Sequence, residues 1–192
     1  MRQETPDALT FFRAFLKAPP VVASAVSSSR LLEQRIVKSA AISDARLVVE
    51  LGSGTGGTTR ALLGAMPADS RLMVFETIDT FVEGLAVVDD PRLDVVHDCA
   101  STLGAALADR HLDGVDAVVS GIPFSTMPPA TARSIIDQVS AALKPGGRFV
   151  AYQFTAAVRD YGRPVLGEPA MQIEWVNIPP TRVFIWTKPE SE

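Results

Sequence analysis

Short apolar runs and longer stretches of helical periodicity alternate along most of this chain. Runs rich in β-branched residues predict strands beginning near residues 47, 72, 93 and 115, and a fifth after the turn at 143–147. Apolar positions recur at helical spacing in the segments between them, at 56–66, 79–88, 100–110 and 129–143. Strand-helix alternation predicts a parallel sheet with helices on both faces.

The pattern changes at the C-terminal end of the chain. Residues 171–176 and 182–187 both read as strands, and only five residues separate them, which leaves no room for a helix. This spacing predicts an antiparallel hairpin. Trp175 and Trp186 alternate with apolar neighbours in the two strands, so we expect both rings to pack in the core.

The first 30 residues differ in composition from the rest and form a separate segment, ahead of a domain at 31–192. At helical spacing, Leu9, Phe12 and Phe15 fall within an apolar arc of about 160°, with Arg13 and Lys17 opposite. We therefore expect an amphipathic helix here. Two interpretations stay open: a lid that packs over the cofactor pocket, or a helix that lies in the headgroup region of a membrane.

Composition narrows the classes of function. At 192 residues with a net charge of -4 and a pI near 5.2, the chain suits a single domain and is a poor match for nucleic-acid phosphates. One cysteine excludes an internal disulfide, and two histidines without ligand-like spacing disfavour a metal site. No apolar run reaches the length of about 18 residues that spans a membrane. The cytoplasm is the expected compartment.

The stretch 47–59, LVVELGSGTGGTT, carries the first candidate chemistry, because a strand runs there into a glycine-rich loop and a helix start. Gly52, Gly54 and Gly57 spell the G-x-G-x-x-G dinucleotide fingerprint, while Glu50 with Gly52, Gly54 and Gly56 spells the E-x-G-x-G-x-G loop of S-adenosylmethionine (AdoMet) methyltransferases. Both interpretations expect an acidic residue on the ribose hydroxyls. Glu76, where the second strand ends, fits that role in either case.

Later motifs separate the two interpretations. Asp98 follows the third strand in VVHDCAS, Gly-Ile-Pro-Phe follows the fourth, and LKPGG at 143–147 precedes the fifth. Positions 47–154 thus resemble the class I AdoMet-dependent methyltransferases. The resemblance implies a Rossmann-like α/β fold with a seven-stranded, mostly parallel sheet and an antiparallel C-terminal hairpin. It implies AdoMet as cofactor, S-adenosylhomocysteine as product, and cofactor-binding residues Glu50, Gly52, Ser53, Gly54, Gly56, Glu76, Thr77, Asp98 and Cys99.

The segment that follows the fourth strand points to the acceptor. Methyltransferases of base amino groups carry an Asn or Asp where this chain has Gly121, before Pro123 and Phe124. This chain therefore lacks the polar side chain that would orient the amino group of a nucleobase. Ser-Gly-Ile-Pro here resembles instead the bacterial phospholipid N-methyltransferases, as do Phe-x-x-x-Phe-Leu-Lys-x-Pro, the Ser-Ser-Arg at 28–30 and NIPPTRV at 177–183. Ser27, where proline is expected, and the brevity of 155–170 depart from that family.

This second resemblance implies stepwise methylation of phosphatidylethanolamine towards phosphatidylcholine by a peripheral enzyme at the inner membrane face. Ser120, Phe124 and Tyr152 are the candidate catalytic residues. Ser120, Ser125, Tyr152 or water could accept the amine proton, and the rings of Phe124 and Tyr152 could hold a methylated ammonium. The candidate substrate-binding residues are Ser120, Gly121, Pro123 and Phe124, with Arg30 and Arg182 as guanidinium forks for the lipid phosphate.

Three other functions stay open. The first is a soluble small-molecule methyltransferase with the same cofactor loop. The second is a protein that binds AdoMet without catalysing transfer. The third is a protein that resembles the RNA adenine N-methyltransferases.

Overall fold

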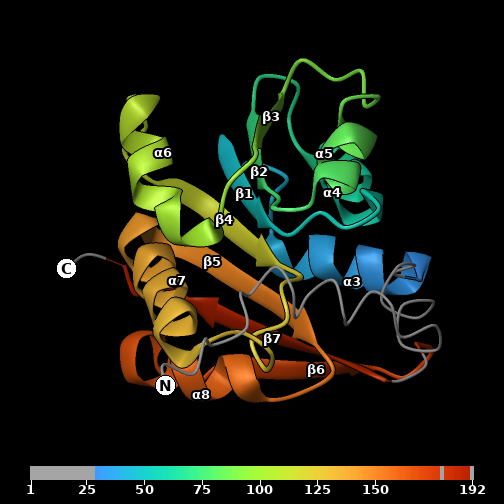
Figure 1. The fold of residues 1–192 in the computed structure, drawn as a ribbon. Helices are drawn as coiled ribbons and strands as arrows, with labels where there is room; N and C mark the ends of the chain where they lie inside the picture. The colour runs from blue at the N-terminus through green and yellow to red at the C-terminus, as the bar shows by residue number, and fades with distance from the viewer. Residues whose placement is uncertain (1–28, 178–179, 191–192) are drawn as a thin grey trace, which may run out of the picture.

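The computed structural model describes residues 29–177 and 180–190. The expected N-terminal amphipathic helix lies outside the described residues. One seven-stranded sheet forms the centre of the molecule (Figure 1). Its strands are β1 (Leu47–Leu51), β2 (Arg71–Phe75), β3 (Leu93–Val96), β4 (Val115–Ser120), β5 (Leu143–Gln153), β6 (Ala170–Glu174) and β7 (Thr181–Thr187).

The strands lie in the order β3-β2-β1-β4-β5-β7-β6. The five from β3 to β5 run parallel, and β7 pairs antiparallel with both β5 and β6. This arrangement confirms the predicted mostly parallel sheet and C-terminal hairpin. The chain order reverses between β1 and β4, and ligands bind beyond the carboxyl ends of the strands at such a point.

Helices cover both faces of the sheet, as Figure 1 shows. They are α3 (Arg30–Ala40), α4 (Gly57–Ala65) and α5 (Asp79–Leu85) on one face, and the 3-10 turn η1 (Ala100–Thr102), α6 (Leu103–Asp109), α7 (Pro129–Ala142) and α8 (Ala157–Leu166) on the other. Each face has its own apolar core. Leu32, Ile36 and Leu62 pack against the sheet on the first face, and Leu103 and Ile136 on the second.

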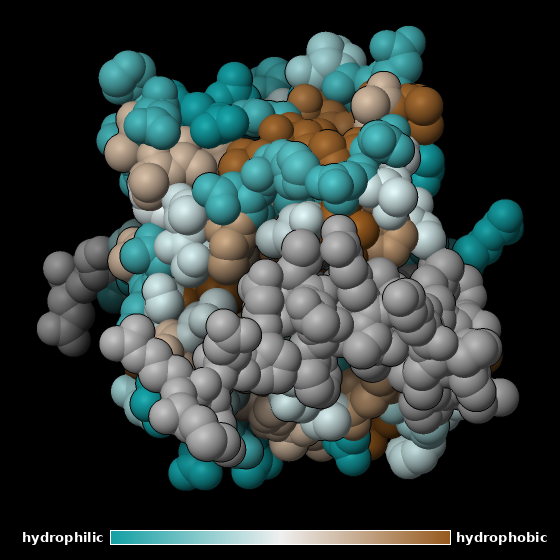
Figure 2. All heavy atoms as spheres, in the orientation of Figure 1, coloured by the Kyte–Doolittle hydropathy of each residue, from teal (hydrophilic) through white to brown (hydrophobic). Residues whose placement is uncertain are grey.

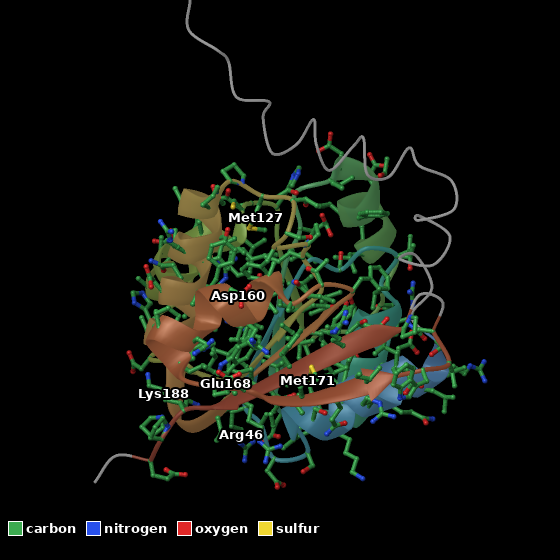
Figure 3. All side chains as sticks on the ribbon, turned by 90° about the horizontal axis from the view of Figure 1, so that it is seen from below. Arg46, Met127, Asp160, Glu168, Met171 and Lys188 are labelled. Atoms are coloured by element: carbon green, nitrogen blue, oxygen red, sulfur yellow. The ribbon has the colours of Figure 1, made fainter. Side chains whose placement is uncertain are left out.

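The outer strands are less completely covered than the central ones. The four residues of β3 are half-buried, and Figure 2 shows apolar surface over β2 and β3, between α5 and α6. At the opposite edge, Met171 of β6 is half-exposed and lies over the β6–β7 ribbon in Figure 3. The deepest burial is therefore at the centre of the sheet, where all five residues of β1 and five of the six residues of β4 are buried.

Three elements differ from the sequence-based expectation, and the first is α3, a helix that the sequence analysis did not predict. The LKPGG segment lies inside β5, where Gly146 has a φ of +73° and the pairing register with β4 shifts between Val115 and Ala117. The short segment after β5 contains α8, whose interior Pro164 and exposed polar residues obscure its helical pattern in the sequence.

The prediction for Trp186 is confirmed, and that for Trp175 is wrong. Trp186 is 2% exposed, stacks on Phe149 at a ring-centroid distance of 5.2 Å, and donates from Nε1 to the Gly167 carbonyl. Trp175 is 71% exposed. The reason is that β6 ends at Glu174, so the alternation that places side chains in the core stops one residue before this ring.

Asp116 joins the amino ends of three central strands. Its Oδ2 accepts hydrogen bonds from the backbone N–H groups of Arg46 (2.7 Å) and Leu47 (2.8 Å), and its Oδ1 accepts one from Lys144 Nζ (2.6 Å). Partial burial opposes ionisation of this carboxyl. The hydrogen bonds and the Lys144 charge outweigh burial and lower its pKa.

Asp116→Asn should destabilise the protein by about 1–2 kcal/mol at pH 7, because it removes a charge-assisted bond and weakens two others. Since the folded-state pKa is depressed, this stability is present above the unfolded pKa of about 3.9 and is lost as the pH falls through the folded value. Urea unfolding at pH 7 and near pH 3 measures the difference. The exposed Asp89→Asn is the control, and an Asp116→Asn penalty independent of pH would contradict the ion pair.

Candidate functional site

The glycine-rich loop crosses between the carboxyl ends of β2 and β4. Gly52 has a φ of +79° and donates from its N–H to the Phe75 carbonyl at 2.8 Å. A Cβ at this position would lie 2.7 Å from Cγ2 of Ile122, so both the backbone conformation and the space require glycine. Gly54, at a φ of +52°, has no atom within 4 Å of the place a Cβ would take, so its surface is open.

Glu76 ties this loop to the end of β2. Its Oε2 accepts hydrogen bonds from the Ser53 N–H and hydroxyl, both at 3.0 Å, and from the Gly54 N–H at 3.2 Å. Its Oε1 accepts from the N–H groups of Thr77 (2.8 Å) and Ile78 (3.1 Å). The carboxylate is 4% exposed and organises two loops at once.

Glu50 lies beneath the loop and is fully buried. Its Oε2 accepts a hydrogen bond from the Thr59 hydroxyl of α4 at 2.6 Å, and its Oε1 has no partner among the described residues. Burial raises the pKa of this carboxyl to about 8, with the neighbouring Glu76 charge adding to the effect and the Thr59 bond opposing it. Glu50 is therefore mostly neutral near pH 7.

Tyr152 occupies the space above Gly121. A Cβ on Gly121 would lie 2.3 Å from the Tyr152 phenol oxygen and 2.7 Å from its Cζ. The same oxygen is 3.3 Å from the Thr58 hydroxyl at the start of α4. The ring from β5 thus fills the position that an amide side chain at residue 121 would need. Burial and the nearby Glu50 carboxyl raise the pKa of Tyr152, so the phenol stays protonated.

Ser120 lies at the end of β4, on the other face of the sheet from Tyr152. Strand alternation places Val119 in the core beneath α3 and Val118 in the core beneath α7, so Ser120 belongs to the α7 side. Its hydroxyl is buried without a partner among the described residues, and so is Oε1 of Gln153 at the end of β5. Gln153 Nε2 donates to the Ile122 carbonyl at 2.6 Å.

The segment after β4 is a compact turn. Thr126 donates to the Pro123 carbonyl from both its N–H and its hydroxyl, each at 3.0 Å. Phe124 is fully buried in the core under α7 and faces Tyr161 of α8 at a ring-centroid distance of 6.4 Å. The structure therefore brings Gly121 and Tyr152 together, and places Phe124 in the adjoining core.

The remaining expected cofactor residues lie at the rim. Thr77 and Asp98 are exposed, and Cys99 is half-buried and donates from its N–H to the Asp98 carboxylate at 2.6 Å. Asp98 follows β3 at the carboxyl ends of the parallel strands, where the glycine-rich loop also lies.

The two arginines expected at a phosphate differ in their surroundings. Arg30 is exposed at the first residue of α3. Arg182 is half-buried in β7, where it pairs with Gln153 and donates from one guanidinium nitrogen to the Phe154 carbonyl. Part of the Arg182 fork is therefore already occupied.

The structure also joins two stretches that are distant in sequence. Ser29 caps α3 by accepting from the Leu32 N–H at 3.2 Å, and its hydroxyl donates to Asn177 Oδ1 at 2.5 Å. Asn177 Nδ2 donates to the Thr181 hydroxyl at 3.2 Å. Ser29 of the Ser-Ser-Arg motif is thus joined to Asn177 and Thr181 of the NIPPTRV motif, which were noted above only as parts of a family pattern. Nothing in either motif alone signals this pairing.

Within residues 29–177 and 180–190, no group of His, Cys, Asp and Glu could hold a metal ion. In the same part of the chain, no helix is both long and apolar enough to cross a membrane. The arrangement offers a glycine-lined cradle at the strand ends, an acidic residue on each side of it, and a neutral phenol beside a glycine.

Comparisons with known proteins show what this chain is similar to. No family model matches the chain. The ornithine lipid N-methyltransferase of Singulisphaera acidiphila is 29% identical over 181 residues, which cover 93% of this chain and 94% of that protein. The ribosomal RNA small subunit methyltransferase H of Aromatoleum aromaticum is 29% identical over 141 residues, and the match spans only 45% of that enzyme.

Solved structures of methyltransferases share the fold at low sequence identity. The N-methyltransferase NodS of Bradyrhizobium japonicum, in complex with S-adenosylhomocysteine, aligns with a TM-score of 0.66 at 15% identity, over 95% of this chain and 98% of that one. A precorrin-6y methyltransferase of Geobacter metallireducens aligns with a TM-score of 0.63 at 14% identity, over 85% and 90% of the two chains. These likenesses confirm the predicted fold class.

Glu50→Gln should stabilise the protein, without added cofactor, by an amount that grows with pH. Glu50 has an unfolded pKa near 4.3 and a folded pKa of about 8, so the folded state holds a proton that the unfolded state releases in this window. The wild type therefore loses stability relative to Glu50→Gln between about pH 4 and pH 8, by at most about 1.4 kcal/mol per pH unit.

Urea unfolding at pH 5, 6.5 and 8 measures this difference, with the exposed Glu83→Gln of α5 as the matched control. If the difference in unfolding free energy between the wild type and Glu50→Gln were the same at all three pH values, Glu50 would be ionised in the folded state throughout this range.

Proposed function

The chain is a class I AdoMet-dependent methyltransferase, and we propose that it methylates the primary amine of a membrane amino lipid. The predictions of enzyme class and of AdoMet as cofactor are confirmed. The observation that carries the choice of acceptor is that similarity to a lipid N-methyltransferase extends over nearly the full length of both chains. It includes the segments outside the cofactor-binding strands, where acceptor specificity is expected.

We take the ornithine lipid amine as the first acceptor to test and phosphatidylethanolamine, implied by the motif resemblance, as the second. Both present an alkyl amine next to an anionic group. Arg30 is exposed and could pair with that anion through its guanidinium fork. Arg182 could do so only with the nitrogens that do not contact Phe154.

The residues at the strand ends fit the cofactor. The surface over Gly54 is open, so a Cβ there would enter the space that the cofactor would need, and the lack of a Cβ on Gly52 lets the loop pass close to Ile122. We propose that Gly52, Gly54 and Gly56 line this space, that Glu76 and Thr77 face the ribose, and that Asp98 and Cys99 hold the adenine. Because Glu76 already accepts five hydrogen bonds, ribose hydroxyls would compete with Ser53 for its Oε2.

The cofactor supplies an electrophilic methyl group on a sulfonium. The acceptor amine would first pass its proton to water, because only the nitrogen lone pair can form the new C–N bond as the C–S bond breaks in line. The contribution of the protein is to orient the amine and to exclude water. No covalent intermediate with the protein is needed.

We propose that Tyr152 orients the amine rather than acting as a phenolate base. Its raised pKa keeps the phenol neutral, so its oxygen can accept a hydrogen bond from the amine while its ring face attracts the methylated ammonium. The unpartnered oxygens of Ser120 and Gln153 add hydrogen-bonding capacity at the ends of β4 and β5. Phe124 would then shape the pocket from the core, without direct contact with the amine.

Two alternatives are less well supported. A nucleobase acceptor would need a polar side chain near residue 121, and Tyr152 fills that space; the net charge of -4 also disfavours RNA. A soluble small-molecule acceptor would fit the same cofactor cradle. The end-to-end similarity to a lipid enzyme favours the lipid, and the peripheral membrane location follows from that choice.

Transfer of labelled methyl from AdoMet to purified lipids in mixed vesicles tests the proposal. We expect label in ornithine lipid, phosphatidylethanolamine or both, separated by head group. Asp98→Ala should lower transfer at least tenfold by weakening cofactor binding, while the exposed control Asp89→Asn keeps it. Binding of AdoMet without label in any lipid, but with label in a small amine, would overturn the lipid acceptor.

Tyr152→Phe should lower kcat by about 10-fold to 100-fold, because the amine loses the hydrogen bond that orients it. The KM for AdoMet should stay within about twofold, since the cofactor cradle is intact. Tyr161→Phe is the matched control, as the only other tyrosine in the chain. Equal effects of the two substitutions would assign Tyr152 a packing role.

A further inference from the structure

The turn between β6 and β7 exposes two large apolar side chains in succession. Trp175 is 71% exposed and Val176 is 62% exposed, and Leu31 at the start of α3 is 49% exposed. We call these three residues the hairpin patch. Exposed Trp is costly in water and is typical of surfaces that meet a partner or the membrane interface.

The turn that carries the patch is braced on both sides. The β6–β7 pairing ends at Glu174 and Thr181. Glu174 Oε2 accepts from Arg35 Nε of α3 at 2.9 Å, and its Oε1 accepts from the Val176 N–H at 3.2 Å. The Arg35 bond lowers the pKa of Glu174, so this carboxylate is ionised and holds the bond near neutral pH.

A second contact holds the same two elements together. The Ser29–Asn177–Thr181 hydrogen bonds connect the N-terminus of α3 to the turn. Leu31, two residues after Ser29, is therefore presented from the helix that supports Trp175 and Val176. Hydrogen bonds on Val176 and Asn177 hold the described residues that flank Trp175, which lowers the entropy lost when this side chain binds a surface.

The hairpin patch lies at the cofactor end of the molecule. Arg182 at the start of β7 pairs with Gln153 at the carboxyl end of β5, the same end at which β4 leads into Gly121. Because β7 runs antiparallel to β5, the turn that precedes β7 lies at the carboxyl ends of the parallel strands, where the glycine-rich loop also lies. A surface bound by the patch would face the candidate acceptor site.

The charge around the patch is opposite to that of the whole chain. Residues 29–40 and 170–182 contain four basic and two acidic side chains, whereas the chain has a net charge of -4. One of the acids, Glu174, is neutralised by Arg35. Arg30 is exposed next to Leu31. An apolar tip with basic neighbours suits an anionic membrane surface, where Trp lies at headgroup level and cations meet the lipid phosphates.

We propose that the hairpin patch is a docking surface for an anionic lipid bilayer, inserting Trp175 and Val176 into the headgroup region with Leu31 beside them. The inference rests on the proposed lipid acceptor and adds a binding surface to it. Three exposed side chains offer far less area than the roughly 800 Å² that each partner contributes to a stable protein interface, which argues against a second copy of the chain as the occupant.

Tryptophan fluorescence tests the proposal directly, because the chain has two tryptophans and Trp186 is 2% exposed. Vesicles of phosphatidylethanolamine with phosphatidylglycerol should shift the emission to the blue and protect it from acrylamide. Lipids brominated near the headgroup should quench it. Trp175→Phe should abolish the shift, since the remaining Trp186 emits from the core. A shift that persists in Trp175→Phe, or its absence in the wild type, would overturn the proposal.

Vesicle partitioning supplies the matched comparison. Trp175→Ala with Val176→Ser should weaken co-sedimentation with these vesicles by about tenfold or more, from the apolar area lost. Val87→Ser is the control, because Val87 is 77% exposed on the α5–β3 loop, away from the patch. Equal partitioning of the two variants would exclude the patch. Concentration-dependent dimers lost only in the patch variant would assign it to self-association instead.

Methyl transfer separates this inference from the proposed function. With lipid in vesicles, the patch variant should show a raised KM for lipid, and with lipid dispersed in detergent micelles its activity should match that of the wild type. If the wild type methylates lipid and the patch variant has the same KM for lipid in vesicles, the docking surface is overturned and the proposed function stands. Insertion of Trp175 without methylation of any amino lipid would overturn the function and leave the surface.

Discussion

The Glu76 carboxylate accepts hydrogen bonds from the glycine-rich loop on one oxygen and from the start of the following loop on the other. This single buried group fixes the relative position of the β1 and β2 loops, which together form the proposed cofactor cradle. Gly52 can follow the required path because it has no Cβ to meet Ile122. The position of Ile122 fixes in turn where the segment after β4 begins.

Packing between Tyr152 and Gly121 shapes the proposed acceptor side of the site in the same way. The phenol fills the space that a polar side chain at residue 121 would need to orient a planar base, so this ring and such a side chain exclude one another. The chemistry available changes with it. A neutral phenol and an aromatic face suit an alkyl amine. Its methylated ammonium has a tetrahedral nitrogen, and the positive charge is not delocalised over a ring.

Hydrogen bonds between α3 and the residues that flank the β6–β7 turn link the proposed acceptor site to the surface of the molecule. Ser29, Arg35, Glu174 and Asn177 hold the two elements together at the cofactor end. The exposed residues that this connection presents and the strand ends that carry the site therefore belong to one rim. A lipid amine in the plane of a membrane would approach the strand ends from that rim.

The sequence by itself determined the order of the strands, the helices α4 to α7 that connect them, the glycine-rich loop and the C-terminal hairpin, because periodicity and the conformational demands of glycine are local properties. It did not indicate α3 or α8. It did identify Glu50, Glu76 and Tyr152 as candidates. Only the tertiary structure decided what surrounds them: Glu50 is neutral because it is buried, Glu76 is shared between two loops, and Tyr152 packs on Gly121. Trp175 was expected in the core and is exposed, because the end of β6, and not alternation, decides where its ring lies. Burial, pKa and contacts between distant segments depend on how the chain packs, and no local pattern carries that information.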